Sequence, residues 1–250
     1  MTTTGTTAFN PDLNDMAEEA FERAGSQLRS GYDMRTARRS LNLLTIEWAN
    51  RGINLWTIES GSIPMVAGTA TYSLPTDTID LIEHVIRTND GSVSLQSDLT
   101  ISRISVDTYA SIPAKLNQGR PIQVWVNRQS AQTYPSGGNS TTGITQPAGV
   151  TPPTITVWPV PNVSSTYTFV YWRLRRIQDA GNGINTQDIP FRFVTCMVAG
   201  WAYYLAQKIP ECRPNIPFLQ AEYERQWALA SEEDREKAAF RFVPRIGYMR

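Results

Sequence analysis

Hydrophobic residues change their spacing twice along the chain, and this change limits the folds available to it. Apolar residues first recur every three or four positions, as in Ala37, Leu41, Leu44 and Trp48, then at every second position, and finally at helical spacing again. A run of strands between two runs of helices favours a segregated α+β fold over a doubly wound sheet. We therefore expect a helical bundle, built from an N-terminal hairpin and C-terminal helices, with an inserted β-rich domain of the sandwich or barrel kind.

Two helices are predicted in the first part of the chain. Asp15 is the expected N-cap of the first helix, where Glu18 completes a capping box and Gly25 ends the helix. Asp33 is the expected N-cap of a longer helix that Gly52 ends. The link between the two helices is short, which predicts an antiparallel helical hairpin.

The C-terminal part has two further helical patterns. Asp188 is the expected N-cap of a helix that is apolar on nearly every side, and such a helix is predicted to lie at the centre of its bundle. A last helix from Pro217 places Leu219, Tyr223 and Trp227 on one stripe.

The middle of the chain reads as strands. Residues 53–58 are predicted as the first strand, and Asn89-Asp90-Gly91 as the turn of a β-hairpin. Both faces of the segment 165–177 are apolar, which predicts a central strand covered on both sides. Residues 129–154 are uncharged and rich in Gly, Ser, Thr and Pro, so we expect a flexible loop, or else a binding element that orders on a partner.

These patterns divide the chain into three parts. We expect a helical bundle domain at 1–52 and 184–239, a β-rich domain at 53–183 and a C-terminal tail at 240–250. The joint between helix and β domain is assigned to Trp48, Gly52, Leu55 and Trp56.

The sequence offers little reactive chemistry. His84 is the single histidine and is expected to be a structural residue with satisfied hydrogen bonds, while Cys196 and Cys212 form no metal or disulfide motif. Phosphate-binding glycine loops and the G-x-S-x-G nucleophile motif are absent. A carboxylate pair is harder to exclude, and Glu47 and Glu59 are the least conventional acidic residues. We predict no enzyme activity, no catalytic residue, no cofactor and no metal.

The charge and hydropathy of the chain limit the kinds of binding partner that we expect. Lys plus Arg and Asp plus Glu are 23 each, giving zero formal net charge, which disfavours tight, charge-driven binding of nucleic acid. No apolar run is long enough to span a bilayer, and the first residues lack the features of a signal peptide. The expectation is a soluble protein that is made in a cytoplasm and has no membrane partner.

Arginines gather in three places. Arg35, Arg38 and Arg39 are interpreted as a solvated helix face. Another group, at 173–176, ends the central strand, and either a solvated end or a site for acidic groups of a partner fits it. The third lies in the tail, where aromatic and aliphatic residues alternate with arginines, as is typical of segments that order on a partner. The predicted docking residues of this tail are Phe240, Arg241, Phe242, Val243, Pro244, Arg245, Ile246, Tyr248 and Arg250.

Four stretches together carry a family resemblance. They are "EEAFERAG", "GYDMRTARRSLNLLTIEWANRGINLWTI", a following "YSLP" and the late "IPFRFVTCMVAGWAYYLAQK". In these stretches the chain resembles the head-to-tail adaptor (connector) proteins of short-tailed bacteriophages, a group that includes tail tubular protein A and the packaged-DNA-stabilising tail accessory factors. The motifs are packing motifs rather than active-site signatures.

The resemblance implies a structural virion protein in the neck, assembled in the host cytoplasm. The implied partners are further copies of the chain in a ring of about twelve, the portal protein ring, the tail nozzle protein, and a tail fibre or spike. Genomic DNA is implied as a transient, non-specific contact in the channel. By the same resemblance, the tail at 240–250 docks on the portal.

Two alternatives to a structural ring subunit stay open. Some relatives have been linked to cell-wall lysis, which keeps a virion-associated peptidoglycan hydrolase in view. Trp125, Trp158 and Trp172 in the β segments motivate a glycan-binding tail component, provided that these aromatic rings are exposed.

Overall fold

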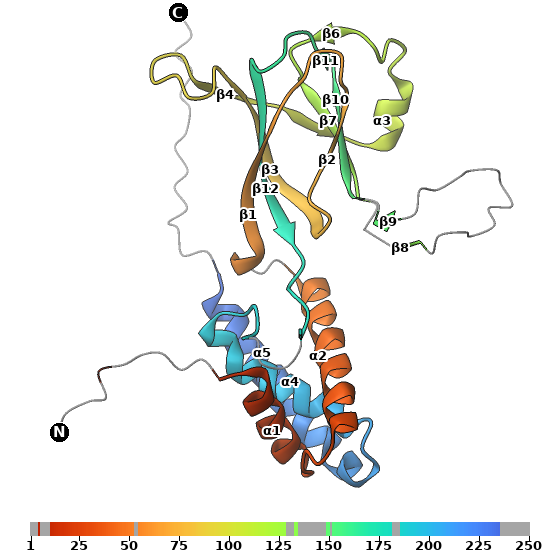
Figure 1. Ribbon diagram of the computed structural model, residues 1–250, viewed down its shortest axis with the longest axis vertical. Helices are drawn as coiled ribbons and strands as arrows, with labels where there is room; N and C mark the ends of the chain where they lie inside the picture. Colours follow the sequence, from red (N-terminus) through yellow and green to blue (C-terminus); the bar gives the residue numbers. More distant parts are fainter. Residues whose placement is uncertain are drawn as a thin grey trace, which may run out of the picture. The chain divides into compact units, whose positions relative to one another are not determined.

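The computed structural model describes residues 5, 11–52, 55–128, 133–134, 149–150, 152–181 and 186–235 (Figure 1). The chain forms two compact units. The first consists of Met1–Leu55 together with Gln178–Arg250, and the second consists of Trp56–Ile177. Helices make up the first unit and strands dominate the second, so the predicted α+β class is confirmed.

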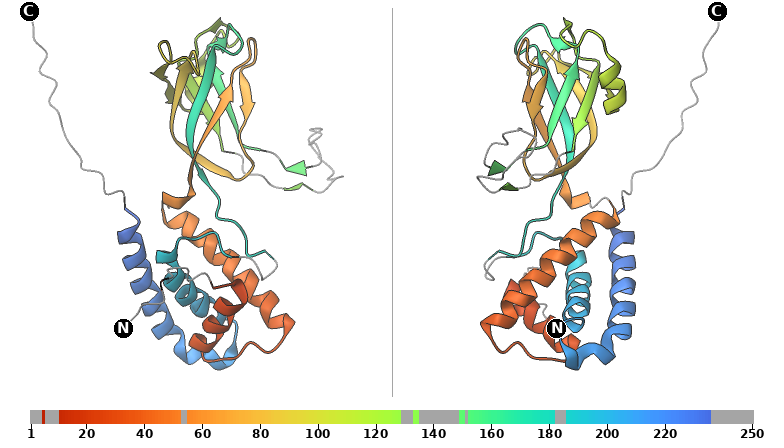
Figure 2. Two further views of the ribbon diagram at one scale, coloured as in Figure 1. Left: turned by 60° about the vertical axis from the view of Figure 1, so that its left-hand side comes forward. Right: turned by 90° about the vertical axis from the view of Figure 1, so that its right-hand side faces the viewer.

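The helical unit is a bundle around one central helix (Figure 2). Its helices are α1 (Leu13–Ala24), α2 (Gly31–Arg51), α4 (Val194–Ala206) and α5 (Ile216–Glu233), with the 3-10 helices η2 (Phe191–Phe193) and η3 (Pro210–Asn215). Helix α4 packs against α1, α2 and α5, as its all-round apolar sequence predicts. The expected hairpin is wrong as a packing unit, because α1 and α2 each pack mainly on α4 rather than on each other.

The helix N-caps differ from those predicted. Asp12, not Asp15, caps α1 and accepts a hydrogen bond from the Asp15 backbone N–H. Ser30 caps α2, and Asp33 lies at the third helical position, where it completes a capping box with Ser30. Gly25 ends α1 with a φ of 94°, as expected for a C-terminal glycine. No side-chain cap precedes α4, and Asp188 instead accepts from the backbone N–H of Gln178.

The predicted apolar stripe forms the core of the bundle. Ala37, Leu41, Leu44 and Trp48 are all completely buried. The indole Nε1 of Trp201 in α4 donates to the Ala37 carbonyl at 2.9 Å. This hydrogen bond fixes the register between α2 and α4.

The β-rich unit contains two four-stranded sheets. The first has the order β1 (Ile58–Pro64), β12 (Tyr167–Arg175), β3 (Thr78–Thr88) and β4 (Ser97–Thr100). The second has the order β2 (Thr71–Ser73), β10 (Thr154–Trp158), β7 (Gln123–Asn127) and β5 (Ser102–Ile104). Smaller elements are η1 (Leu55–Thr57), α3 (Val106–Ser111) and the paired short strands β6 (Gln118–Gly119) with β11 (Val160–Pro161) and β8 (Thr133–Tyr134) with β9 (Gly149–Val150).

The two sheets share one apolar core, which makes the unit a β-sandwich. Ile86 and Phe169 come from the first sheet, and Val124 and Ile155 come from the second; all four are fully buried in one cluster. Every neighbouring pair of strands within the two four-stranded sheets is antiparallel except β5 with β7.

Two strand predictions need correction. Residues 55–57 form the 3-10 helix η1, and the first strand begins only at Ile58. The predicted hairpin exists as β3 and β4, but residues 89–96 connect the strands, so the turn is longer than the tight one expected. Asn89 and Gly91 do adopt positive φ values, of 51° and 83°.

Strand β12 occupies the central position that was predicted for it, between β1 and β3. Its second face is less covered than expected, because Trp172 is 36% exposed. The pairing with β3 is shifted by one residue opposite Trp172 and Arg173, so that Ile82 bulges out. Consequently Ile82 is exposed while His84 and Ile86 face the core.

Most of the loop 129–154 lies outside the described residues, apart from β8, β9 and the residues that begin β10. Among the helices that the structure describes, none has the length and apolar character needed to cross a membrane.

Candidate functional site

The sequence assigned two sites, a docking tail and a joint. All of the tail residues, 240–250, lie outside the described part of the chain. The joint is described at Trp48 and Gly52, which belong to α2 and its end, and at Leu55 and Trp56 in η1.

Trp48 is the anchor of the joint on the helical side. Its side chain is completely buried, and its indole Nε1 donates to the hydroxyl of Tyr223 in α5 at 2.9 Å. The ring packs against Phe193 and Trp227 at centroid distances of 5.5 and 5.4 Å. Trp48 therefore ties the end of α2 to α5 and to the start of α4 through both packing and a buried hydrogen bond.

A polar network surrounds this anchor. Glu47 accepts hydrogen bonds from the hydroxyls of Tyr204 at 2.5 Å and Tyr223 at 3.2 Å. Arg51 bonds Glu47 and reaches Glu224 through two nitrogens, at 2.9 and 2.7 Å. Burial, followed by the proximity of Glu47, raises the pKa of both tyrosines above the ordinary value. The hydroxyls are therefore held as donors, which is the form that this network needs.

The chain leaves α2 through a glycine and is held again at Leu55. Gly52 has a φ of 153°, a conformation that a side chain rarely adopts. The Leu55 backbone N–H donates to Asp234 Oδ2 at 3.0 Å, and Arg192 pairs with the other carboxylate oxygen. Asp234 is nearly buried, with its side chain 4% exposed. The end of α5 thus fixes the first described residue after Gly52.

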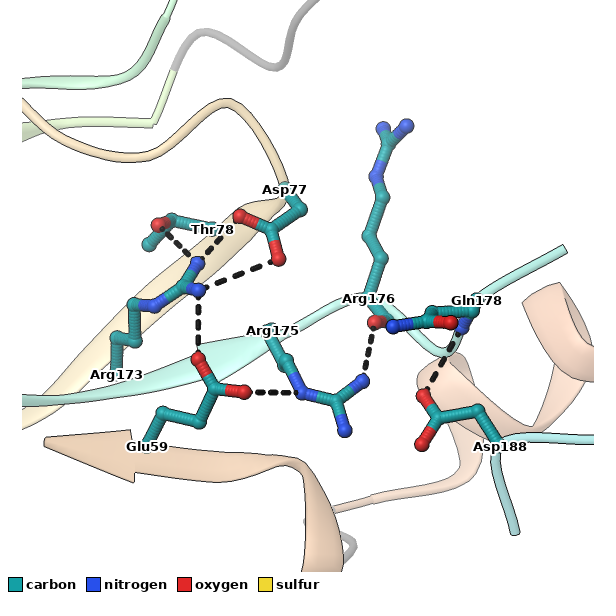
Figure 3. A network of polar contacts seen from close by, with 8 residues as sticks. All are labelled: Glu59, Asp77, Thr78, Arg173, Arg175, Arg176, Gln178 and Asp188. Atoms are coloured by element: carbon teal, nitrogen blue, oxygen red, sulfur yellow. Dashed lines mark hydrogen bonds and ion pairs between the residues drawn. The ribbon is translucent and has the colours of Figure 1, made fainter.

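The β-rich unit has its own charged cluster, at the start of β1 and the end of β12 (Figure 3). The guanidinium of Arg173, 10% exposed, bonds Glu59 at 2.7 Å and Asp77 at 2.5 Å, and also the hydroxyl of Thr78 at 2.9 Å. Burial alone would raise the pKa of Asp77, but the hydrogen bond from Arg173 and the positive charges of Arg173 and Arg175 together lower it.

Arg175 joins the same cluster through Glu59, at 2.7 Å (Figure 3). Of the predicted arginine group, Arg173 and Arg175 are therefore neutralised within their own chain rather than offered to acidic groups of a partner. Glu59, which the sequence marked as an unconventional carboxylate, serves as their shared counter-ion. Arg176 points away from the cluster in Figure 3.

The histidine and the two cysteines are buried. His84 is 6% exposed, stacks on Phe169, and neither ring nitrogen has a hydrogen-bond partner, so the expectation of a satisfied histidine is wrong. Burial raises the pKa of the Cys196 thiol to about 12 and also raises that of Cys212. Within the described residues, no group of His, Cys, Asp or Glu is arranged to hold a metal ion.

The tryptophans considered for glycan binding are mostly engaged. Trp125 is half-buried and stacks on Tyr109 at 5.6 Å, and Trp158 donates to the Ala114 carbonyl at 3.1 Å. Trp172 is the most exposed of the three, at 36%. Three such rings do not form an open aromatic platform here.

Sequence reasoning missed several members of the helical network. Tyr204, Glu224 and Asp234 lie more than 150 residues from their partners in α2 and η1. Only Glu47 carried a signal, as a carboxylate on an otherwise ordinary helix. The first arginine group was interpreted as a solvated face, yet Arg35, Arg38 and Arg39 line a pocket.

The contacts described around Trp48 and Leu55 are ring packing, hydrogen bonds and ion pairs. The sequence matches the family described as SU10 adaptor protein over residues 11–244. The match spans both units, so the chain belongs to this family of phage adaptor proteins, which are structural components of the virion. No curated protein matches the sequence.

Proposed function

We propose that the chain is a head-to-tail adaptor of a short-tailed phage, related to tail tubular protein A, that forms a ring between portal and tail nozzle. In this role it extends the DNA channel and helps to retain the packaged genome in the virion neck. The family match over residues 11–244 is the observation that carries the proposal, because it includes the helical unit and the β-sandwich together.

The physical properties of the chain support such a role. A ring built from identical subunits needs two different complementary patches on every copy. DNA that must slide through a channel cannot be held tightly by phosphate contacts, and 23 basic against 23 acidic residues meet that condition.

Electron microscopy of the purified protein mixed with the portal ring of the same phage tests the proposal. We expect a ring of added density on one face of the portal, and native mass spectrometry then gives its copy number. Assembly on the portal is the decisive condition, because a ring subunit can stay monomeric without its template. A chain that stays monomeric in the presence of portal rings contradicts the proposal.

The portal contact is assigned to the tail. We propose that residues 240–250 dock on the portal, since their arginines and aromatic residues are of the types enriched at binding hot spots. Deletion of Phe240–Arg250 is expected to leave the far-ultraviolet circular dichroism spectrum and thermal unfolding unchanged and to weaken portal attachment. Attachment of the shortened chain at wild-type strength assigns the contact elsewhere.

A further inference from the structure

A pocket in the helical unit gathers positive charge from one face of α2. The pocket has a volume of about 670 Å³ and is lined by Arg35, Arg38 and Arg39, together with Tyr32, Asn42 and residues 179–181. Arg35 and Arg39 are exposed and Arg38 is half-buried. Elsewhere in this unit Arg51 and Arg192 pair with carboxylates, but none of the three pocket arginines does so within the described residues.

Arg38 and Arg39 donate hydrogen bonds to neutral oxygen atoms rather than to carboxylates. Arg38 donates through Nη1 to the Gly181 carbonyl at 3.2 Å, while its Nε is buried without a partner. Among the described residues, Arg39 donates a hydrogen bond to the hydroxyl of Thr36, at 3.3 Å. Burial, and next the charge of Arg39, lower the pKa of Lys208.

The same unit carries a negative stripe on α1. Asp15, Glu18 and Glu22 are exposed at positions i, i+3 and i+7, which places them along one face of the helix. Glu19 pairs with Arg23, but within the described part of the chain the three stripe residues have no ion pair. The helix dipole accounts for an acid near the start of a helix, whereas Glu22 lies close to the end of α1, where the dipole disfavours it.

We propose that the arginine pocket of one copy receives the Asp15, Glu18 and Glu22 stripe of a second copy. The inference rests on the proposed ring, because a ring joins two different patches of identical chains. Guanidinium groups bind carboxylates through paired hydrogen bonds, so a row of carboxylates on a helix suits this pocket. Such a contact satisfies both uncompensated surfaces at once.

A nucleic acid is a poorer fit to the pocket. The chain as a whole has no positive excess, which disfavours binding to a phosphate backbone. The stripe on α1, in contrast, supplies a partner of matching charge on every copy. Complementary charge of this kind selects partners and orientation as well as strengthening a contact.

Charge exchange between two variants tests the proposal. Variant A carries Arg35→Glu and Arg38→Glu, and variant B carries Glu18→Arg and Glu22→Arg. Each variant alone, mixed with portal rings, is expected to assemble at least about tenfold more weakly than the wild type, because like charges then face each other. An equal mixture of A and B is expected to regain the ring. When A and B alternate, the acidic pocket of A meets the basic stripe of B, and the basic pocket of B meets the acidic stripe of A.

Native mass spectrometry and electron microscopy read the assembly, and circular dichroism checks that each variant is folded. The matched control is Arg120→Glu with Arg213→Glu, which makes the same charge change at two other exposed arginines. We expect the control to assemble like the wild type, and equal loss in the control would overturn the proposal. Normal assembly of A or B alone, or no recovery in their mixture, would also overturn the proposed contact between copies. The proposed ring function would still stand in either case.

Two further results separate the alternatives. If the wild type forms no ring on the portal, the proposed function fails and this contact fails with it. Fluorescence anisotropy with a short DNA duplex at low salt tests the nucleic-acid alternative. Loss of DNA binding in variant A with unchanged ring assembly would assign the pocket to DNA and overturn the contact between copies.

Discussion

The helical unit and the β-sandwich treat the polar groups in their interiors differently. In the helical unit, the buried indole nitrogens of Trp48 and Trp201 both donate to oxygen acceptors, and Glu47 is bonded by two tyrosines and an arginine. In the sandwich core, both ring nitrogens of His84 are buried without a partner. Satisfied networks favour a single arrangement of helices, while an unsatisfied buried group lowers stability. The network around Trp48 therefore specifies how its helices pack, whereas His84 contributes no ring hydrogen bond to the sandwich core.

The largest expected effect comes from removing the anchor of the helical network. Trp48→Ala deletes a completely buried ring and leaves the Tyr223 hydroxyl without its donor, so the free energy of unfolding of the helical unit should fall by about 3–5 kcal/mol. Urea unfolding combined with hydrogen exchange resolved by unit measures it. Trp172→Ala, at a ring 36% exposed in the sandwich, is the matched control and should cost about 1 kcal/mol or less. Equal losses of unfolding free energy in the two variants would contradict the role of Trp48 as a buried anchor.

A smaller effect is expected where helices approach closely. A Cβ at Gly200 would lie 2.8 Å from the Tyr223 ring and 2.9 Å from Leu44 Cδ1. Gly200→Ala should therefore destabilise the helical unit by about 1–3 kcal/mol, despite the better helix propensity of alanine. Gly31→Ala is the control, because a Cβ there meets nothing within 4 Å. Thermal unfolding compares the two variants. A higher stability of Gly200→Ala than of Gly31→Ala would contradict the close packing at Gly200.

The network also predicts an alkaline limit for the helical unit. The pKa values of Tyr204 and Tyr223 are raised above the ordinary 10.0, so the unfolded chain loses these protons first. Stability from the two hydroxyls is complete below pH 10 and declines as the pH rises above it. Tyr204→Phe should lessen this decline, whereas Tyr32→Phe, at a ring 66% exposed, should not. Unfolding by urea at pH 8 and about pH 11 compares them, and identical slopes in all three proteins would exclude this origin.

The sequence predicted the elements of the fold better than their contacts. The spacing of Ala37, Leu41, Leu44 and Trp48 identified a buried face correctly, because burial on a helix repeats with the helical period. It did not show which helix covers that face, and α1 turned out to neighbour α4 rather than α2. The caps were misplaced because Asp, Ser and Asn recur within a few residues, and only the backbone geometry decides which one caps.

At the joint and in strand β3, likewise, the sequence indicated local features but not contacts between distant residues. Trp48 and Gly52 could be identified because an aromatic stripe and a glycine stop are local signals. Asp234, which holds Leu55, looked like one acid in a charged helix end, and its role depends on a contact across 179 residues. Ile82 is exposed although it lies two residues from the buried His84, because the pairing of β3 with β12 is shifted by one residue at Ile82. A bulge of this kind depends on strand pairing, which one strand does not encode.

The smallest expected effect concerns His84, and it tests the sandwich side of the comparison. Burial, partly offset by Glu83 and reinforced by Arg103, lowers the pKa of His84 below its ordinary 6.5. The unfolded chain therefore binds a proton before the folded one does, so stability that is present above pH 6.5 is lost as the pH falls. His84→Leu should flatten this dependence between pH 6.5 and about 5, and change stability at pH 8 by about 1 kcal/mol or less, because no hydrogen bond is lost.

Nuclear magnetic resonance can follow this group directly, because His84 is the single histidine of the chain. We expect the imidazole of the folded protein to stay neutral at pH 6.5 and to gain its proton only at lower pH. The leucine variant serves as its own control in urea unfolding across the same pH range. An imidazole that titrates at or above 6.5 would mean that a partner stabilises its charged form, and His84 would then resemble the satisfied polar groups around Trp48.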